Sequence, residues 1–214
     1  MNFKPSTFYI GIIDLFAVLL PGAIASLVIY HFFHANIDDF MNTSENGQAF
    51  LPGFSLLFSS YLIGHIISQI SAYLDEWVYD PLKEIVYKDH KHIDKILEIR
   101  KEHYQNELNP VYVNGYKWSL YKLQKEYPEA IVEIDRYMAD SKFFRSLFVV
   151  QFFLVVIFLF LPEIDIWLES ILVLLTAFSM IRYFKKRRKA TQTAYQYIIF
   201  SEELNHKAES STKD

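Results

Sequence analysis

The chain of 214 residues contains no cysteine. It therefore forms no disulfide, offers no thiolate nucleophile and builds no zinc site on cysteine. Glycine is also scarce, with six residues in all. No glycine-rich phosphate-binding loop, Gly-x-Ser-x-Gly elbow or His-Glu-x-x-His motif occurs. Because the common signatures of enzymes are missing, we expect a protein without catalytic activity, metal or cofactor.

Lysine and arginine are missing from two stretches, residues 35–53 and 162–170, although the chain has 21 of them. Apolar segments at residues 8–33, 54–73, 146–161 and 164–184 flank these two gaps. About 20 apolar residues cross a bilayer, and basic residues collect on its cytoplasmic side. The pattern predicts an all-α protein with four transmembrane helices and both termini in the cytoplasm. A soluble protein with a buried helical hairpin is the alternative, but it leaves the one-sided basic residues unexplained.

The expected organisation has four parts. Residues 8–73 form the first transmembrane pair, 74–142 a small cytoplasmic helical layer, 143–184 the second pair and 185–214 a basic tail. In the layer we expect helices over 82–107, 116–125 and 128–144, the last running into the third span. Pro52-Gly53 closes a polar outer loop over 35–53. The tail is expected to lose helical structure from residue 208.

The first pair of spans carries polar residues at helical spacing. One ridge of small residues on the second span suits close helix packing, as does a kink in the first span at Pro21-Gly22; the ridge comprises Ser60, Gly64 and Ser68. A polar ridge lies beside it at the same spacing and comprises Tyr61, His65 and Gln69. Asp14 is expected at a similar depth, within reach of His65. These residues are candidates for a pore or gate, for a hydrogen bond that only locks two helices, or for a proton relay.

A basic run follows the last span and comprises Lys185, Lys186, Arg187, Arg188 and Lys189. Its expected role is to fix topology and to contact anionic lipid headgroups. A site for a nucleotide or oligonucleotide is the alternative, because phosphates need the same charges. Aromatic side chains nearby would then stack on bases; they are Tyr116, Trp118, Tyr121, Tyr195 and Tyr197.

Three stretches carry a resemblance: Asp14-Leu15-Phe16 with Leu20-Pro21-Gly22, Gly64-His65, and Ala139-Asp140-Ser141-Lys142-Phe143-Phe144-Arg145-Ser146-Leu147. Together they resemble a family of small four-pass bacterial inner-membrane proteins of uncharacterised function. The architecture is also similar to membrane effectors of anti-phage systems such as Hailong, in which a nucleotide signal restrains an oligomeric pore. That second likeness is one of plan, and it carries no binding residue over to this chain.

The third stretch also has a physical interpretation. Phe143-Phe144 would lie at headgroup level where the chain enters the membrane, and we expect Arg145 to extend its guanidinium back to the cytoplasm.

These observations favour a homo-oligomeric inner-membrane pore gated through its cytoplasmic helices, with a role in anti-phage defence as the setting that the resemblance implies. Its partners would be the lipid bilayer and, on the cytoplasmic side, a nucleotide, an oligonucleotide or a soluble protein. A membrane-anchored interaction module that conducts nothing is the second hypothesis. An intramembrane enzyme is the third.

Overall fold

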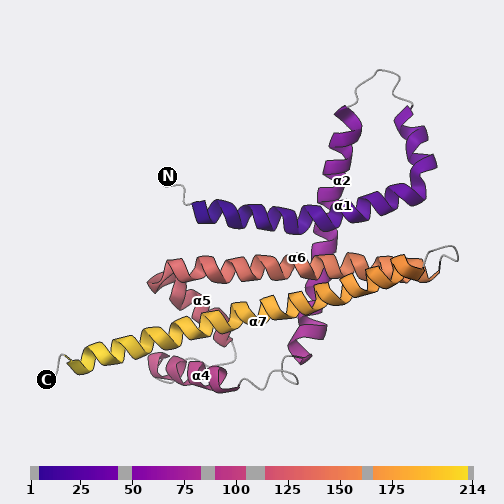
Figure 1. Cartoon of the computed structure of the whole chain (residues 1–214). Helices are drawn as coiled ribbons and strands as arrows, with labels where there is room; N and C mark the ends of the chain where they lie inside the picture. Colours follow the sequence, from indigo (N-terminus) through magenta and orange to yellow (C-terminus); the bar gives the residue numbers. More distant parts are fainter. Residues whose placement is uncertain (1–4, 43–49, 83–89, 105–113, 161–165, 212–214) are drawn as a thin grey trace. The chain divides into compact units, whose positions relative to one another are not determined.

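The computed structural model describes residues 5–42, 50–82, 90–104, 114–160 and 166–211 (Figure 1). Within these ranges all regular structure is helical, which confirms the predicted all-α class. The elements are α1 (Pro5–Asn42), α2 (Phe50–Leu74), the π-helical turn η1 (Asp75–Tyr79), α4 (His90–Tyr104), α5 (Gly115–Glu126), α6 (Pro128–Leu159) and α7 (Ile166–Ser211).

Four helices in the described part of the chain are long and apolar enough to cross a membrane. The candidate spans are Leu15–Phe32, Gly53–Leu82, Pro128–Leu159 and Ile166–Leu204, and each contains an apolar stretch of 18 residues. Large apolar side chains lie exposed along these stretches, among them Leu57, Phe153 and Leu174. Such a surface would aggregate in water but is matched by lipid tails. The chain is therefore a multi-pass membrane protein, as the four apolar segments predict.

The helices are longer than the sequence predicts. α1 continues to Asn42 and α2 begins at Phe50, so the expected loop over 35–53 is mostly helical. Residues 35–42 contain no glycine or proline to end α1. Pro52 lies in the first turn of α2, where its missing N–H costs no helical hydrogen bond. For the same lack of a helix breaker, α7 runs through Ser211, past the expected end at 208.

Helix α6 is continuous from Pro128 to Leu159, which confirms that the last helix of the layer runs into the third span. Pro128 suits the first helical turn, and it also ends α5, because the residue before a proline avoids helical geometry. Tyr127, with φ −137° and ψ 67°, is that residue. At the other end of α5 the Asn114 side chain accepts a hydrogen bond of 2.8 Å from the Lys117 backbone N–H.

The chain divides into two compact units, and α6 and α7 contribute to both. Unit 1 contains Met1–Ile10, Pro81–Met138 and Lys185–Asp214, and unit 2 contains Gly11–Asp80 and Ala139–Phe184. The divisions at 80/81, 138/139 and 184/185 compare with sequence-based boundaries at 73/74, 142/143 and 184/185.

Unit 1 is built around an apolar core. Ile96 of α4, Leu123 of α5, Ile134 of α6 and Ile198 of α7 pack together and are almost completely buried. Small residues of α7 let the helices approach closely at this point; they are Ala190 and Ala194. Side chains at helical spacing on four helices thus form a core like that of a soluble helical bundle.

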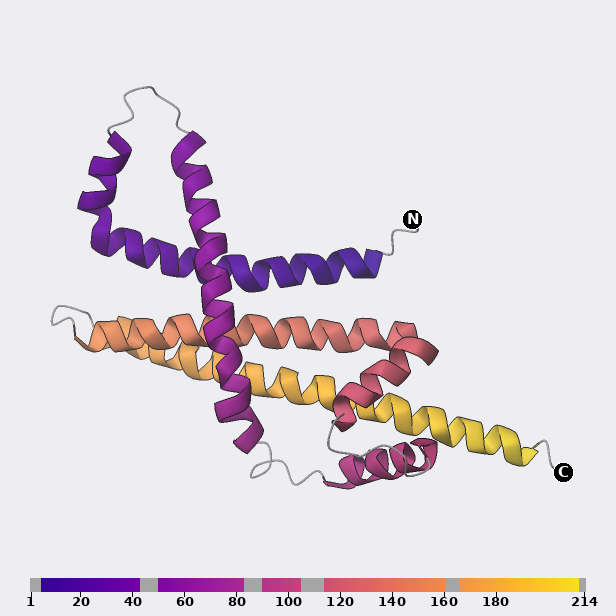
Figure 2. The same cartoon turned by 180° about the vertical axis from the view of Figure 1, so that it is seen from behind.

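Unit 2 is built around a close crossing of α1 and α2, which both views of the chain show (Figures 1 and 2). A Cβ atom on Gly22 would lie 1.8 Å from the Ser60 carbonyl oxygen, and one on Gly64 would lie 2.1 Å from that of Val18. No side chain fits at either position, so the two backbones are in direct contact. α6 joins this unit through Val149 and Val150, which pack on Ile67 of α2.

Candidate functional site

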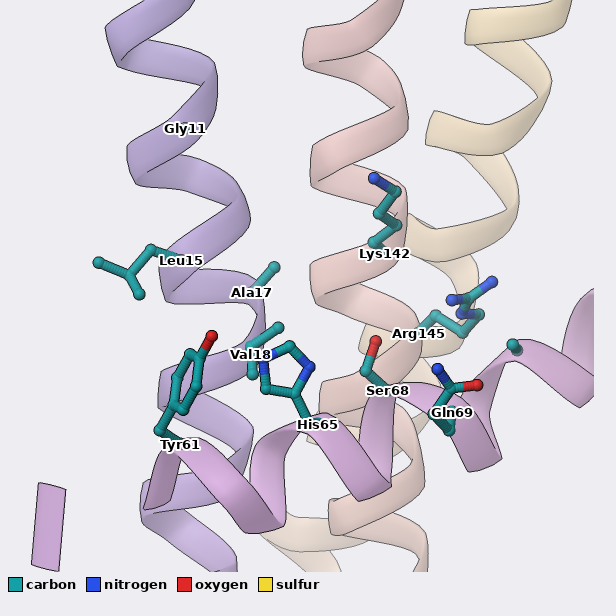
Figure 3. Close-up of a pocket in the computed structure, with 11 residues that line it drawn as sticks. Gly11, Leu15, Ala17, Val18, Tyr61, His65, Ser68, Gln69, Lys142 and Arg145 are labelled. Atoms are coloured by element: carbon teal, nitrogen blue, oxygen red, sulfur yellow. The ribbon is translucent and has the colours of Figure 1, made fainter. Parts of the chain in front are cut away.

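A cavity of about 540 Å³ opens in unit 2 beside the crossing of α1 and α2. Residues from α1, α2 and α6 line it: Gly11, Leu15, Ala17, Val18, Tyr61, His65, Ser68, Gln69, Ala72, Lys142 and Arg145. The α1 wall is apolar, whereas α2 supplies hydrogen-bonding side chains and α6 supplies two cations (Figure 3). The cavity is therefore open and combines an apolar wall with polar side chains, of which Tyr61, His65 and Gln69 are exposed.

The polar ridge of α2 faces this cavity. Tyr61, His65 and Gln69, singled out from their spacing, all line it. The rings of Tyr61 and His65 meet edge to face with centroids 4.5 Å apart, and Figure 3 shows both directed toward α1, with Val18 beside the His65 ring. Four-residue spacing on one helix thus brings a phenol, an imidazole and an amide into a single space.

The small-residue ridge is split between two roles in the structure. Ser60 and Gly64 are buried at the crossing with α1, opposite Gly22. Pro21 is buried next to Gly22, and α1 runs through it without interruption of the helix. Ser68, one turn further along α2, lines the cavity instead.

The pairing of Asp14 with His65 remains a prediction. Residue 14 belongs to α1, but its side chain lies outside the part that the structure describes. Its neighbours Gly11, Leu15 and Val18 line the cavity.

Whether Arg145 extends toward the cytoplasm remains a prediction, but the structure gives its partners within unit 2. Its side chain is turned into unit 2, where only 9% of the residue is exposed. The guanidinium pairs through Nη1 with the Asp75 carboxylate and donates from Nε to Ser71 Oγ at 3.2 Å. The Asp75 carboxylate and the Ser71 hydroxyl offset the cost of burying this charge.

Arg145 belongs to a polar network that joins α2, α6 and α7. The Ser71 and Ser146 hydroxyl oxygens lie 3.3 Å apart, and both residues are buried. On the other side, the Tyr183 hydroxyl donates to Asp75 Oδ1. Asp75 therefore accepts from Arg145 of α6 and from Tyr183 of α7 at once. We call these five residues the polar clasp: Ser71, Asp75, Arg145, Ser146 and Tyr183.

The clasp coincides with an irregularity in the helix. Asp75 is the first residue of η1, the π-helical turn Asp75–Tyr79 that continues α2. Such turns are rare and occur often at functional sites. At the end of the turn, the Tyr79 ring lies 6.0 Å from that of Tyr183 and 5.6 Å from that of Phe184. Both ends of η1 thus contact α7.

Sequence reasoning missed the clasp and Lys142. A usable signal exists for the clasp, because Asp75 and Arg145 are opposite charges placed at the edges of apolar segments. No signal in the sequence pairs them, since they lie 70 residues apart and on different helices.

The basic run of α7 lies in unit 1, where part of it packs on α6. The ammonium groups of Lys186 and Lys189 lie 5.4 and 4.6 Å from the centre of the Tyr137 ring. Arg187 contacts the Met138 sulfur at 2.9 Å. Lys185 is exposed and Arg188 is half-buried. The run is thus partly engaged with the protein itself.

Two of the five proposed stacking platforms are not available to a nucleic acid. Trp118 and Tyr195 are buried in the unit 1 core, and Lys122 lies 5.6 Å from the Trp118 ring centre. Tyr121 and Tyr197 are exposed, although the Tyr197 hydroxyl donates to Glu133 at 2.8 Å. Tyr116 is half-buried, and its hydroxyl has no hydrogen-bond partner among the described residues.

Burial raises the pKa of Tyr116 to about 12, with Arg187 opposing the shift. The phenol therefore stays neutral in unit 1.

Comparisons with family models, curated proteins and solved structures find no match for this chain. The fold and site define its class as a multi-pass membrane protein with four candidate spans in the described residues and an open cavity in unit 2 that carries polar side chains.

Proposed function

We propose that the protein is an oligomeric channel of the bacterial inner membrane, and that the cavity of unit 2 forms part of its path. The observation that carries the proposal is the lining of that cavity. Polar and charged side chains in a membrane span are costly and usually face a protein interior or water. Tyr61, His65, Gln69 and Lys142 share one space of about 540 Å³, which is large enough for several waters.

The polar clasp is the proposed gate. It connects α2, α6 and α7 at one level through hydrogen bonds to Asp75 and Ser71, and Arg145 also lines the cavity. A rearrangement of Arg145 would alter both the packing of three helices and the charge in the path. In the resting state the clasp is closed and flux is low.

The cytoplasmic helices would control the gate through α6 and α7. Each of these helices carries residues of the unit 1 core and residues of the clasp on one continuous element: Ile134 and Arg145 on α6, and Ile198 and Tyr183 on α7. A ligand that repacks the unit 1 core would therefore act on the clasp without an intervening loop. Both termini would face the cytoplasm, in keeping with the distribution of basic residues.

Single-cysteine variants test the path directly, because the chain contains no other thiol. We expect purified His65→Cys and Gln69→Cys protein in liposomes to lose ion flux when a charged, thiol-reactive reagent is added. Ile66→Cys is the matched control, since Ile66 is exposed on α2 and does not line the cavity. Absence of flux in an intact oligomer, with the clasp weakened by Asp75→Asn, would reject a channel.

A pore of this kind fits the anti-phage setting implied by the likeness in plan to Hailong effectors. A nucleotide or oligonucleotide would then be the signal received by unit 1. Binding of radiolabelled nucleotide to the purified protein would support this extension. The binding should be lost in Lys185→Gln and retained in a variant with a substitution in unit 2.

A second candidate function is a non-conducting anchor that recruits a soluble protein. Exposed apolar side chains in unit 1 favour it: Tyr121 is 68% exposed and Phe200 is 63% exposed. Phe200→Ser would abolish partner capture by the whole protein while leaving any flux unchanged. A channel without a protein partner predicts the same flux and no capture by either form.

A further inference from the structure

The two ends of the cavity differ in chemistry. Its cationic side is formed by Lys142 and Arg145 of α6, and its apolar wall by Leu15, Ala17 and Val18 of α1. Figure 3 shows the two cations projecting from neighbouring turns of α6, with the apolar residues on the facing helix. A ligand with both an anionic group and an apolar part would match this lining.

The cationic side lies at the depth of lipid phosphates. Lys142 immediately precedes the mostly apolar stretch 143–160, which comprises the end of α6 and the turn residue Phe160. At 1.5 Å per residue this stretch is about 27 Å long, close to the thickness of the hydrocarbon layer. Lys142 is therefore at one edge of that layer, and Arg145 is one turn deeper.

Arg145 has donors to spare for such a ligand. Its guanidinium carries five N–H donors, of which Nε and Nη1 serve Ser71 and Asp75. The remaining N–H groups and the Lys142 ammonium suit phosphate oxygens, which form charge-assisted hydrogen bonds with both side chains. The Ser68 hydroxyl and the Gln69 amide line the same side and add neutral donors.

We infer that this cavity binds the phosphate of an anionic phospholipid, with Lys142 and Arg145 at the headgroup and Leu15 and Val18 along the start of an acyl chain. Lipid binding stands by itself. Its consequence for flux rests on the proposed function: a headgroup in this space occupies the proposed path, so release of the lipid would open it.

Lipid retention measured on the whole protein tests the inference without any flux assay. The protein is purified in mild detergent, incubated with phosphatidylglycerol or phosphatidylcholine, and weighed intact by native mass spectrometry. We expect preferential retention of phosphatidylglycerol, reduced about tenfold in Lys142→Gln, since one charge-assisted hydrogen bond is worth about 1.5 kcal/mol or more. Lys125→Gln is the matched control, because Lys125 is an exposed lysine of α5, outside both the cavity and the basic run of α7.

The outcomes of this experiment distinguish a phospholipid headgroup from free phosphate as the ligand. Loss of lipid in Lys142→Gln alone, unaffected by an excess of inorganic phosphate, supports a phospholipid site. Equal displacement by inorganic phosphate would overturn the lipid part, because the apolar wall would then contribute nothing. Equal retention in both variants and in wild type, with unchanged helix content by circular dichroism, would overturn the site. Reduced lipid retention in Lys142→Gln with unchanged flux would instead count against the proposed path and leave the lipid site standing.

Discussion

The two units are built on opposite principles. In unit 1 the side chains with almost no exposure are mostly apolar and include Ile96, Leu123, Ile134 and Ile198, with Ser119 as an exception. In unit 2 the corresponding side chains are mostly hydroxyl-bearing; they are Ser60, Ser71, Ser146, Ser179 and Tyr183. Water drives apolar residues into the core of unit 1. Lipid exerts no such force between helices, so small and hydrogen-bonding residues hold unit 2 together.

Removing the clasp cation should have the largest effect. Arg145→Ala leaves the Asp75 carboxylate without its ion-pair partner in a largely buried place, and losing one partner of a buried pair costs about 3–5 kcal/mol. We expect unfolding in mixed detergent micelles at a much lower denaturant fraction. Lys185→Ala should behave like wild type, because Lys185 is exposed. Equal stability of the two variants would contradict the buried ion pair.

Truncating a buried apolar side chain should cause the next largest loss in the free energy of unfolding, and only in unit 1. Leu123→Ala empties a fully buried position of the unit 1 core and should cost about 2–4 kcal/mol. The equivalent truncation at Leu57, which is 59% exposed on α2, should change the free energy of unfolding by much less. Similar losses at both positions would mean that unit 2 also relies on apolar burial.

Adding a methyl group at the crossing of α1 and α2 should lower the free energy of unfolding by a smaller amount, through unit 2. Gly64→Ala places a methyl group against the backbone of Val18, and overpacking costs about 1–3 kcal/mol. Gly53→Ala in the same helix is the control, because nothing lies within 4 Å of a Cβ there. It should be neutral or slightly stabilising, since alanine favours helix. Proximity of α1 and α2, measured by cross-linking, should fall only in the first variant.

Removing a single hydroxyl group from unit 2 should change the free energy of unfolding by less. Ser146→Ala removes the contact with Ser71 Oγ but leaves the Arg145 donor in place, and interhelical hydrogen bonds in membranes average about 0.6 kcal/mol. Double-mutant cycles with Ser71→Ala would measure the coupling. A coupling of several kcal/mol would mean that the clasp is more cooperative than its separate bonds.

The smallest effect is expected at Tyr116, and it depends on pH. Burial raises its pKa to about 12 in the folded protein, against about 10 in the unfolded chain. The unfolded state therefore loses its proton first, and stability falls as pH rises from 10 toward 12. Tyr116→Phe, which removes a hydroxyl without a hydrogen-bond partner, should be near neutral at pH 7 and less sensitive to alkali. Identical pH profiles would contradict the raised pKa.

Sequence reasoning reached the fold class because membrane thickness and helix geometry act locally. Apolar length predicts the spans, and a four-residue spacing places Tyr61, His65 and Gln69 on one face of α2. The clasp escaped it, because Arg145 pairs with Asp75, which lies 70 residues away on another helix. The helix ends also escaped it, because polar residues without glycine or proline do not terminate a helix.

The continuity of α7 has a mechanical consequence. The single helix α7 carries both Ile198, which packs in the core of unit 1, and Tyr183, which contacts Asp75. An α-helix resists twisting because each turn is hydrogen-bonded to the next. Rotation of α7 near Ile198 would therefore move the Tyr183 hydroxyl. A rotation of α7 by one residue position, about 100°, would move the Tyr183 hydroxyl away from the carboxylate, so in the proposed channel this contact would respond to the rotational position of α7.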